Sequence, residues 1–218
     1  MIGPAANNRP WLAATGILAA IFVAAAFFAA ALDRFPGDLA VSLLVQSWNS
    51  PLLEAVSKAA SLEENRLVIL SLMLVVVFVL FLLRWRRESY FLLGSTVSGV
   101  VVIELTKALV ARPRPTLDLV LVLQDVSSQS FPSGNVALFS VYLIALALVM
   151  ASRTADRRKA IAAWGLSAAL LTFIGLSRIY LGAHWLSDVL AGYLLGLMWV
   201  LVIAQIMHAL SHREVNAD

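Results

Sequence analysis

The sequence contains no cysteine and few charged residues. The absence of cysteine from all 218 residues excludes disulfide bonds and thiolate chemistry. Charged residues make up 13% of the chain and hydrophobic residues 61%, whereas a soluble domain has about 25% charged residues. So few charges cannot cover the surface of a soluble domain of this length, and the composition therefore indicates a membrane protein.

Long uncharged runs predict an all-α fold with six transmembrane helices. The expected spans are residues 11–32, 67–83, 89–111, 135–151, 160–176 and 189–207. The first run is longer than the hydrophobic part of a signal peptide, about 7–15 residues, so we expect a retained transmembrane helix. Because no internal repeat or low-complexity linker separates the runs, we expect one polytopic domain over residues 1–218.

The segment between the first two runs is amphipathic rather than uniformly apolar. Residues 39–48 and 52–60 combine apolar and polar side chains, which predicts one or two short helices at the membrane interface. Trp48 and Trp85 lie where an aromatic belt would place them.

Lysine and arginine residues are clustered, and the clusters predict the orientation of the chain. Segment 84–87 contains three arginines, and segment 153–159 contains three arginines and a lysine. By the positive-inside rule both segments face the cytoplasm, and so do both termini. The segments that follow the third and fifth spans then lie at the extracytoplasmic face, which we expect to be that of a bacterial inner membrane.

The extracytoplasmic segments contain the residues that a phosphate site needs. Fixed positive charge comes from Lys107, Arg114 and Arg178, and the two guanidinium groups can bind phosphate oxygens in pairs. Ser133 and Gly134 immediately precede the fourth span. The free N–H groups and the dipole of a helix N-terminus favour an anion at that position.

A candidate nucleophile lies in the last of these segments. His184 and Asp188 are four residues apart, so they would share one face if the segment is helical. The carboxylate could then hold one imidazole nitrogen and leave the other free to attack phosphorus.

Each feature also has a plainer explanation. Lys107 could extend its ammonium group to the interface, Ser133 could be a helix N-cap, and His184 could be an interfacial residue. Their coincidence at one face of the membrane favours a functional site, because charged groups near spans are costly and usually functional.

Three motifs in this region resemble the signature of the type 2 phosphatidic acid phosphatase superfamily, which includes membrane lipid phosphatases and soluble vanadium haloperoxidases. The motifs are Lys-x6-Arg-Pro, Pro-Ser-Gly-x and Ser-Arg-x5-His-x3-Asp, and they occur in that order over residues 107–188. The resemblance implies a phosphate site without a metal or another cofactor, in which His184 forms a phosphohistidine and Asp188 orients it. The phosphate ligands that it implies are Lys107, Arg114, Ser133, Gly134 and Arg178.

The second motif departs from the family pattern at Asn135, where a histidine is usual. That histidine is thought to protonate the leaving oxygen, and asparagine can form only a hydrogen bond. General acid catalysis contributes about 10²–10⁴-fold, so we expect phosphate binding with slow turnover or none. The substitution is either an engineered change that blocks catalysis or natural divergence.

The resulting hypothesis is a phosphatase of a lipid-linked phosphomonoester or diphosphate, such as phosphatidic acid, phosphatidylglycerol phosphate or undecaprenyl diphosphate. The expected partners are this substrate and membrane lipids, with no nucleic acid. The alternative is a non-catalytic lipid-phosphate binding or transport protein. A haloperoxidase is disfavoured because those relatives are soluble. His208 and His212 have the spacing of metal ligands but no evident third ligand, so we expect residues of a cytoplasmic tail.

The orientation can be tested by cysteine labelling, since the chain has no cysteine of its own. Single cysteines introduced into segments 84–88 and 153–159 should resist an impermeant thiol reagent in intact cells. A cysteine at Arg34, on the opposite side in this topology, is the labelled control. Labelling of the first two segments from outside would overturn the orientation.

Overall fold

The structure is a computed structural model that describes residues 9–215, apart from the side chains of residues 9, 62–64, 66 and 212–215. The described part contains helices and no strands. The helices are α1 (Arg9–Ala31), α2 (Asp38–Gln46), α3 (Pro51–Ala59), α4 (Leu62–Leu82), α5 (Arg86–Val110), α6 (Gly134–Ser152), α7 (Arg157–Tyr180) and α8 (Leu186–Val215).

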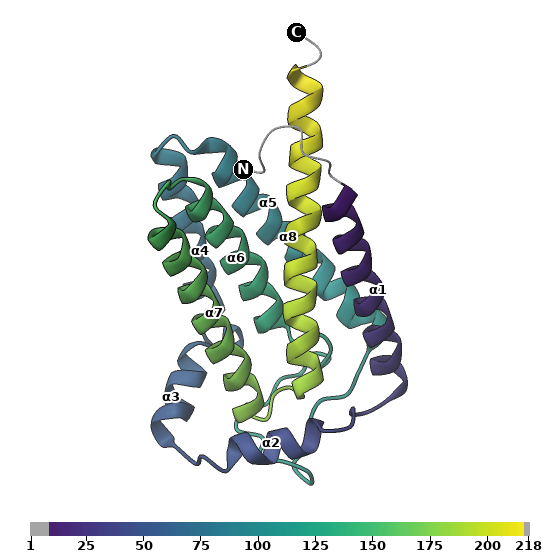
Figure 1. Cartoon of the computed structure of the whole chain (residues 1–218). Helices are drawn as coiled ribbons and strands as arrows, with labels where there is room; N and C mark the ends of the chain where they lie inside the picture. Colours follow the sequence, from purple (N-terminus) through teal and green to yellow (C-terminus); the bar gives the residue numbers. More distant parts are fainter. Residues whose placement is uncertain (1–8, 216–218) are drawn as a thin grey trace.

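The six long helices form a bundle, and the two short helices lie across one end of it (Figure 1). We call this the α2–α3 end. Helix α6 is central, because it packs against α5, α7 and α8. The ends of α5 and α7 and the starts of α6 and α8 all lie at the α2–α3 end.

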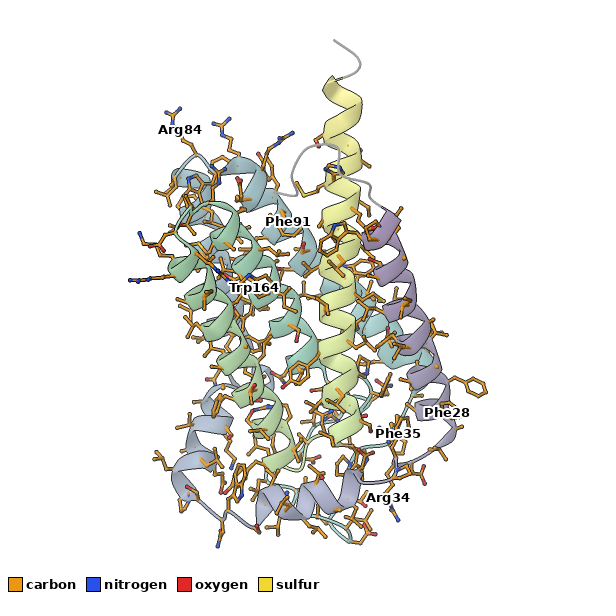
Figure 2. All side chains as sticks on the ribbon, in the orientation of Figure 1. Phe28, Arg34, Phe35, Arg84, Phe91 and Trp164 are labelled. Carbon is orange, nitrogen blue, oxygen red and sulfur yellow. The ribbon has the colours of Figure 1, made fainter. Side chains whose placement is uncertain are left out.

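The length and apolar character of the helices confirm an all-helical membrane protein. Five helices are long and apolar enough to cross a membrane: Pro10–Ala31, Arg86–Val110, Gly134–Ser152, Arg157–Tyr180 and Leu186–Ser211. Large apolar side chains cover the outside of the bundle, for example Phe28, which is 54% exposed and extends away from α1 (Figure 2).

The sixth predicted span, residues 67–83, forms only the apolar part of α4. This part, Leu67–Leu82, is shorter than a full span. Charged residues occupy the first turns of α4, and Asn65 interrupts its helical geometry with φ −124° and ψ 30°. The structure therefore supports five spans, and the sixth stays a prediction.

The two short helices expected between the first two spans are present as α2 and α3. Gln46 anchors α2 across the bundle end by donating to the carbonyls of Leu121 (2.7 Å) and Tyr180 (3.1 Å). The Ser50 hydroxyl caps α3 by accepting from the Leu53 N–H. Their location at a membrane interface stays a prediction.

Close packing of α8 on α6 aligns the starts of these two helices. Gly192 and Gly196 of α8 face α6, and a Cβ atom added to Gly196 would lie 2.3 Å from the Ser140 Cβ. Glycines four residues apart let two backbones approach in this way. At the α2–α3 end, the Ser133 N–H donates to the Asp188 carbonyl (3.0 Å), which joins the N-terminal ends of both helices.

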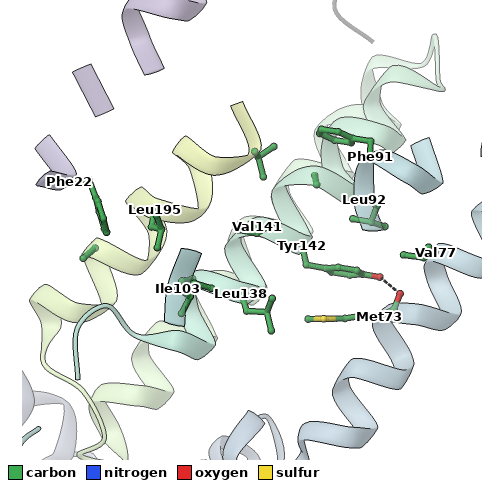
Figure 3. Close-up of a cluster of buried hydrophobic side chains, with 14 of the residues drawn as sticks. Phe22, Met73, Val77, Phe91, Leu92, Ile103, Leu138, Val141, Tyr142 and Leu195 are labelled. Carbon is green, nitrogen blue, oxygen red and sulfur yellow. Dashed lines mark hydrogen bonds between the residues drawn. The ribbon is translucent and has the colours of Figure 1, made fainter. Parts of the chain in front are cut away.

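The bundle interior is filled by apolar side chains from α1, α4, α5, α6 and α8 (Figure 3). Phe22 and Leu195 lie on one side of α6 in this view, and Met73 and Val77 lie on the other. The Tyr142 hydroxyl is the polar exception in this view, and it donates to the Met73 carbonyl (3.1 Å).

The two basic segments between long helices lie together at the end opposite α2 and α3, where Figure 2 labels Arg84. Arg153 connects them, since it pairs with Glu88 (2.5 Å) and lies 4.9 Å from the ring centre of Trp85. Their placement on one side agrees with the predicted topology. Which side faces the cytoplasm stays a prediction.

Candidate functional site

The predicted site residues gather at the α2–α3 end. They come from the last turns of α5 and α7, the loop 111–133, the first turns of α6 and α8, and the turn 181–185 between α7 and α8. These segments meet because α6 packs against α5, α7 and α8.

The turn after α7 fixes the backbone of His184. Gly182 has φ +64°, and a Cβ atom there would lie 2.0 Å from the Leu121 carbonyl oxygen, so this position requires glycine. The Arg178 carbonyl accepts from the N–H groups of Ala183 (3.1 Å) and His184 (3.3 Å). His184 is thereby held just before α8.

His184 and Asp188 are neighbours, but the segment is not helical at His184, so the condition for a shared helix face is not met. Helix α8 begins at Leu186, so only Asp188 lies in its first turn. The Asp188 carboxylate reaches back and accepts from the Trp185 N–H (2.9 Å), as in one half of a capping box. This brings Asp188 Oδ2 to 3.7 Å from His184 Nδ1.

The contacts of His184 define which nitrogen is protonated. Arg114 Nη1 lies 3.1 Å from His184 Nε2, and because arginine can only donate, Nε2 must accept. In the neutral ring the proton is therefore on Nδ1. This nitrogen faces Asp188 Oδ2 and lies 3.5 Å from Ser130 Oγ. The Ser130 hydroxyl also donates to Asp188 Oδ2 (2.5 Å).

The surroundings keep the imidazole neutral. Burial and the nearby Arg114 guanidinium lower the pKa of His184 to about 4, against the opposing effect of Asp188. At neutral pH the ring is thus uncharged, and its Nε2 lone pair is available once Arg114 releases it. A neutral imidazole is the form that can act as a nucleophile.

Arg112 was missed as a functional residue by the sequence reasoning. It is 1% exposed and bridges two buried carboxylates. Its Nη1 atom lies 2.6 Å from Asp188 Oδ1, and its Nη2 atom lies 3.1 Å from Asp38 Oδ2. Asp38 in turn accepts from the backbone N–H and the hydroxyl of Ser187 (2.9 and 2.7 Å). Arg112 therefore fixes the carboxylate that faces His184.

Lys107 and Arg114 converge on the same backbone atom. The Gln129 carbonyl accepts from Lys107 Nζ (2.7 Å) and from Arg114 Nη2 (3.3 Å). Arg114 also donates to the carbonyls of Ser128 (2.6 Å) and Ala183 (2.5 Å). The two cations predicted to bind one anion are thus brought together around a single oxygen.

The start of α6 lies beside these cations. A Cβ atom on Gly134 would lie 3.2 Å from Lys107 Cε, so the lysine packs closely against the helix end. The N-cap residue Ser133 is fully buried, and its hydroxyl has no hydrogen-bond partner within the described part of the chain. Asn135 is 1% exposed and follows in the first turn. The backbone N–H groups at a helix N-terminus can bind an anion.

Arg178 is the predicted site residue whose side chain points elsewhere. Its guanidinium is fully buried and donates to Ser61 Oγ (2.8 Å), Gln124 Oε1 (3.1 Å) and the Ser57 carbonyl (2.7 Å). Phosphate binding by Arg178 would require it to exchange these partners, and this role stays a prediction. Its observed contribution is the backbone carbonyl that holds His184.

A cavity of about 500 Å³ lies next to the cations, between α4, α5 and α6. Lys107, Ser128 and Asn135 form its polar end, and apolar side chains such as Leu70 and Leu138 form its walls. This combination suits an amphiphile with an anionic headgroup.

No arrangement for a metal ion occurs among the described residues, where no three His, Cys, Asp or Glu side chains are grouped for one. His208 lies far along α8 from the site, and the side chain of His212 is outside the described residues. The candidate site instead offers cations and helix N–H groups.

Comparison with known sequences gives a family match. A model described as the PAP2 superfamily matches residues 88–211. A curated undecaprenyl-diphosphatase from Sulfolobus acidocaldarius is 29% identical over 120 residues, which cover 54% of this chain and 53% of that relative. The chain thus spans about half the length of this relative.

Two crystal structures have a similar fold. A transmembrane PAP2 type phosphatidylglycerolphosphate phosphatase from Bacillus subtilis has a TM-score of 0.75 at 22% identity, covering 89% of this chain and 96% of that one. Aquifex aeolicus LpxE has a TM-score of 0.63 at 24% identity, covering 80% and 98%. At these identities the likeness establishes the fold alone.

The Arg112 bridge can be tested by stability measurements in detergent. Arg112→Ala would leave Asp38 and Asp188 buried without a counter-charge, which costs about 3–5 kcal/mol. We expect a large drop in the thermal midpoint, and adding Asp38→Asn should recover part of it. Arg87→Ala, at an exposed arginine, is the control. Equal midpoints for the two arginine variants would contradict the bridge.

Proposed function

Because the chain belongs to the PAP2 superfamily, we propose that it is a membrane lipid phosphatase acting through a phosphohistidine at His184. The main supporting observation is the orientation of the imidazole. Its Nε2 atom faces Arg114, while its Nδ1 atom faces Asp188 and Ser130. A neutral imidazole held in this way presents one nitrogen to a phosphate bound by the cations.

The phosphate would bind where the Gln129 carbonyl now accepts from Lys107 and Arg114. Displacement of this carbonyl frees donors on both side chains for phosphate oxygens. The start of α6 would contribute the Ser133 hydroxyl and the backbone N–H groups at Gly134 and Asn135. These fixed donors stabilise the charge on the equatorial oxygens in the transition state.

In the first step, His184 Nε2 attacks phosphorus, and the bond to the leaving oxygen breaks. Arg114 transfers its hydrogen bond from Nε2 to a phosphate oxygen, which frees the lone pair. The ring becomes positively charged, and Asp188 stabilises that charge through the Nδ1 proton. Arg112 and Asp38 keep Asp188 in place. In the second step, water attacks the phosphohistidine and releases inorganic phosphate.

Asn135 stands where the family has a general acid, so residue 135 can donate a hydrogen bond but cannot transfer a proton. Two alternatives follow. The leaving oxygen departs without a proton and the first step is slow, or another group in the cavity supplies the proton. The handicap is smaller for a diphosphate, whose leaving phosphate needs little protonation.

The cavity and the names of the relatives support a proposal for the substrate class. The cavity joins a cationic end to apolar walls, which suits a phosphate attached to a lipid tail. One relative is named for undecaprenyl diphosphate and one similar structure for phosphatidylglycerol phosphate. We propose a lipid-linked phosphomonoester or diphosphate as the substrate. The site would face the extracytoplasmic side of a bacterial inner membrane, with both termini in the cytoplasm.

A non-catalytic lipid-phosphate binding protein is the second candidate, and Asn135 is the observation that favours it. Such a protein would use the same cations and the same helix start. It would bind a lipid phosphate without forming a covalent intermediate, so trapping of a phosphoenzyme separates the two candidates.

The experiment uses purified protein in detergent, incubated with ³²P-labelled phosphatidic acid and quenched in denaturant. We expect labelled protein with the alkali-stable, acid-labile bond of a phosphohistidine. His184→Ala should abolish both the label and phosphate release, because no other group at this position can form the intermediate. His208→Ala, on the far part of α8, should leave both unchanged. Binding of the lipid without any label would favour the non-catalytic candidate.

A further inference from the structure

Glu104 is a carboxylate in an apolar part of α5. Between Ser89 and the end of this helix at Val110, it is the one acidic residue. A carboxylate placed there is costly in a membrane, and such residues usually face a cavity and serve a function. Sequence reasoning gave Glu104 no role.

Glu104 lines the same cavity as Lys107 and Asn135. Val100, Ile103, Glu104 and Lys107 all line it, and their spacing places them on one face of α5. Glu104 is exposed, so the cavity extends to the molecular surface at this carboxylate. A molecule bound in this cavity would therefore contact both Glu104 and Asn135, the residue that replaces the usual histidine.

The position of Glu104 along α5 matches the position of a leaving group. Helix α5 ends at the α2–α3 end, so Glu104 lies one turn deeper in the bundle than Lys107, about 4.5 Å along the axis. Leu138 lies one turn deeper than Asn135 on α6 and lines the apolar part of the cavity. A phosphate held at Lys107 with its tail among the apolar walls would place the bridging oxygen near Glu104.

We propose that Glu104 is a further catalytic residue, which supplies the proton that Asn135 cannot transfer to the leaving oxygen. This inference rests on the proposed phosphatase function.

The proton balance is complete over the two steps. In the first, the P–N bond to His184 Nε2 forms, the P–O bond to the leaving group breaks, and the Glu104 proton passes to the leaving oxygen. The products are an alcohol, a phosphohistidine and the Glu104 carboxylate. In the second, water attacks phosphorus, its proton passes to Glu104, and the P–N bond breaks to release phosphate and neutral His184.

The test compares two substrates that differ in their need for an acid. The alkoxide that leaves dioctanoyl phosphatidic acid requires protonation, whereas the nitrophenolate that leaves p-nitrophenyl phosphate does not. Glu104→Gln should lower kcat for the lipid by about 10²–10⁴-fold and for the aryl phosphate by less than about tenfold. Glu54→Gln, an acid-to-amide change on α3, is the control and should alter neither rate.

Rescue at residue 135 gives a second readout. Asn135→His should restore most of the lipid rate in the Glu104→Gln background, since one acid is enough. Three results would overturn the role of Glu104. They are equal losses of rate on both substrates, no loss on either substrate, and a gain in the lipid rate of about 10²–10⁴-fold from Asn135→His alone. In each of these cases the phosphoenzyme at His184 would still form and the proposed function would stand. Absence of a phosphoenzyme with p-nitrophenyl phosphate would overturn both.

Discussion

The buried bridge from Asp38 through Arg112 to Asp188 is the interaction on which the site depends. Its three charged groups are at most 2% exposed, and such a group is tolerated only when its charge is balanced and its hydrogen bonds are formed. The bridge joins the start of α2, the loop after α5 and the first turn of α8. These segments are far apart in the sequence, so the bridge fixes them relative to one another. Because Arg112 binds Oδ1 of Asp188, the other carboxylate oxygen, Oδ2, faces His184 and accepts from Ser130 and Trp185.

The helix ends supply the rest of the site. Close contact between α6 and α8 at Gly192 and Gly196 places the N-terminal ends of both helices side by side. One end offers an anion site beside Lys107, and the other positions Asp188. Between them, the tight turn at Gly182 presents His184. The cavity between α4, α5 and α6 then adds apolar walls and Glu104. In the proposed mechanism, the phosphate ligands, the nucleophile and the walls that would hold a lipid tail lie in adjacent parts of one bundle end.

Local patterns predicted most of the fold, because apolar runs and their charged ends determine where membrane helices lie. The sixth span stayed unsettled since the charges before Leu67 shorten the apolar run in α4. The motif residues Lys107, Arg114 and His184 were predicted from type and spacing, and the structure brings them together. Asp38 could not be predicted, since its partner Arg112 is 74 positions away and no periodicity connects them. The side-chain direction of Arg178 depends on Ser57, Ser61 and Gln124, which the motif does not include.

The central claim is that His184 Nε2 attacks a phosphate held by Lys107, Arg114 and the start of α6. A structure determined with vanadate, which adopts the geometry of phosphate in transfer, tests it most directly. The account predicts vanadium bonded to His184 Nε2, with its oxygens on Lys107, Arg114 and the N–H groups at Gly134 and Asn135. The Gln129 carbonyl should have moved away from both cations. Vanadate bound elsewhere, with Arg114 still hydrogen-bonded to Nε2 and Gln129 in place, would contradict the account.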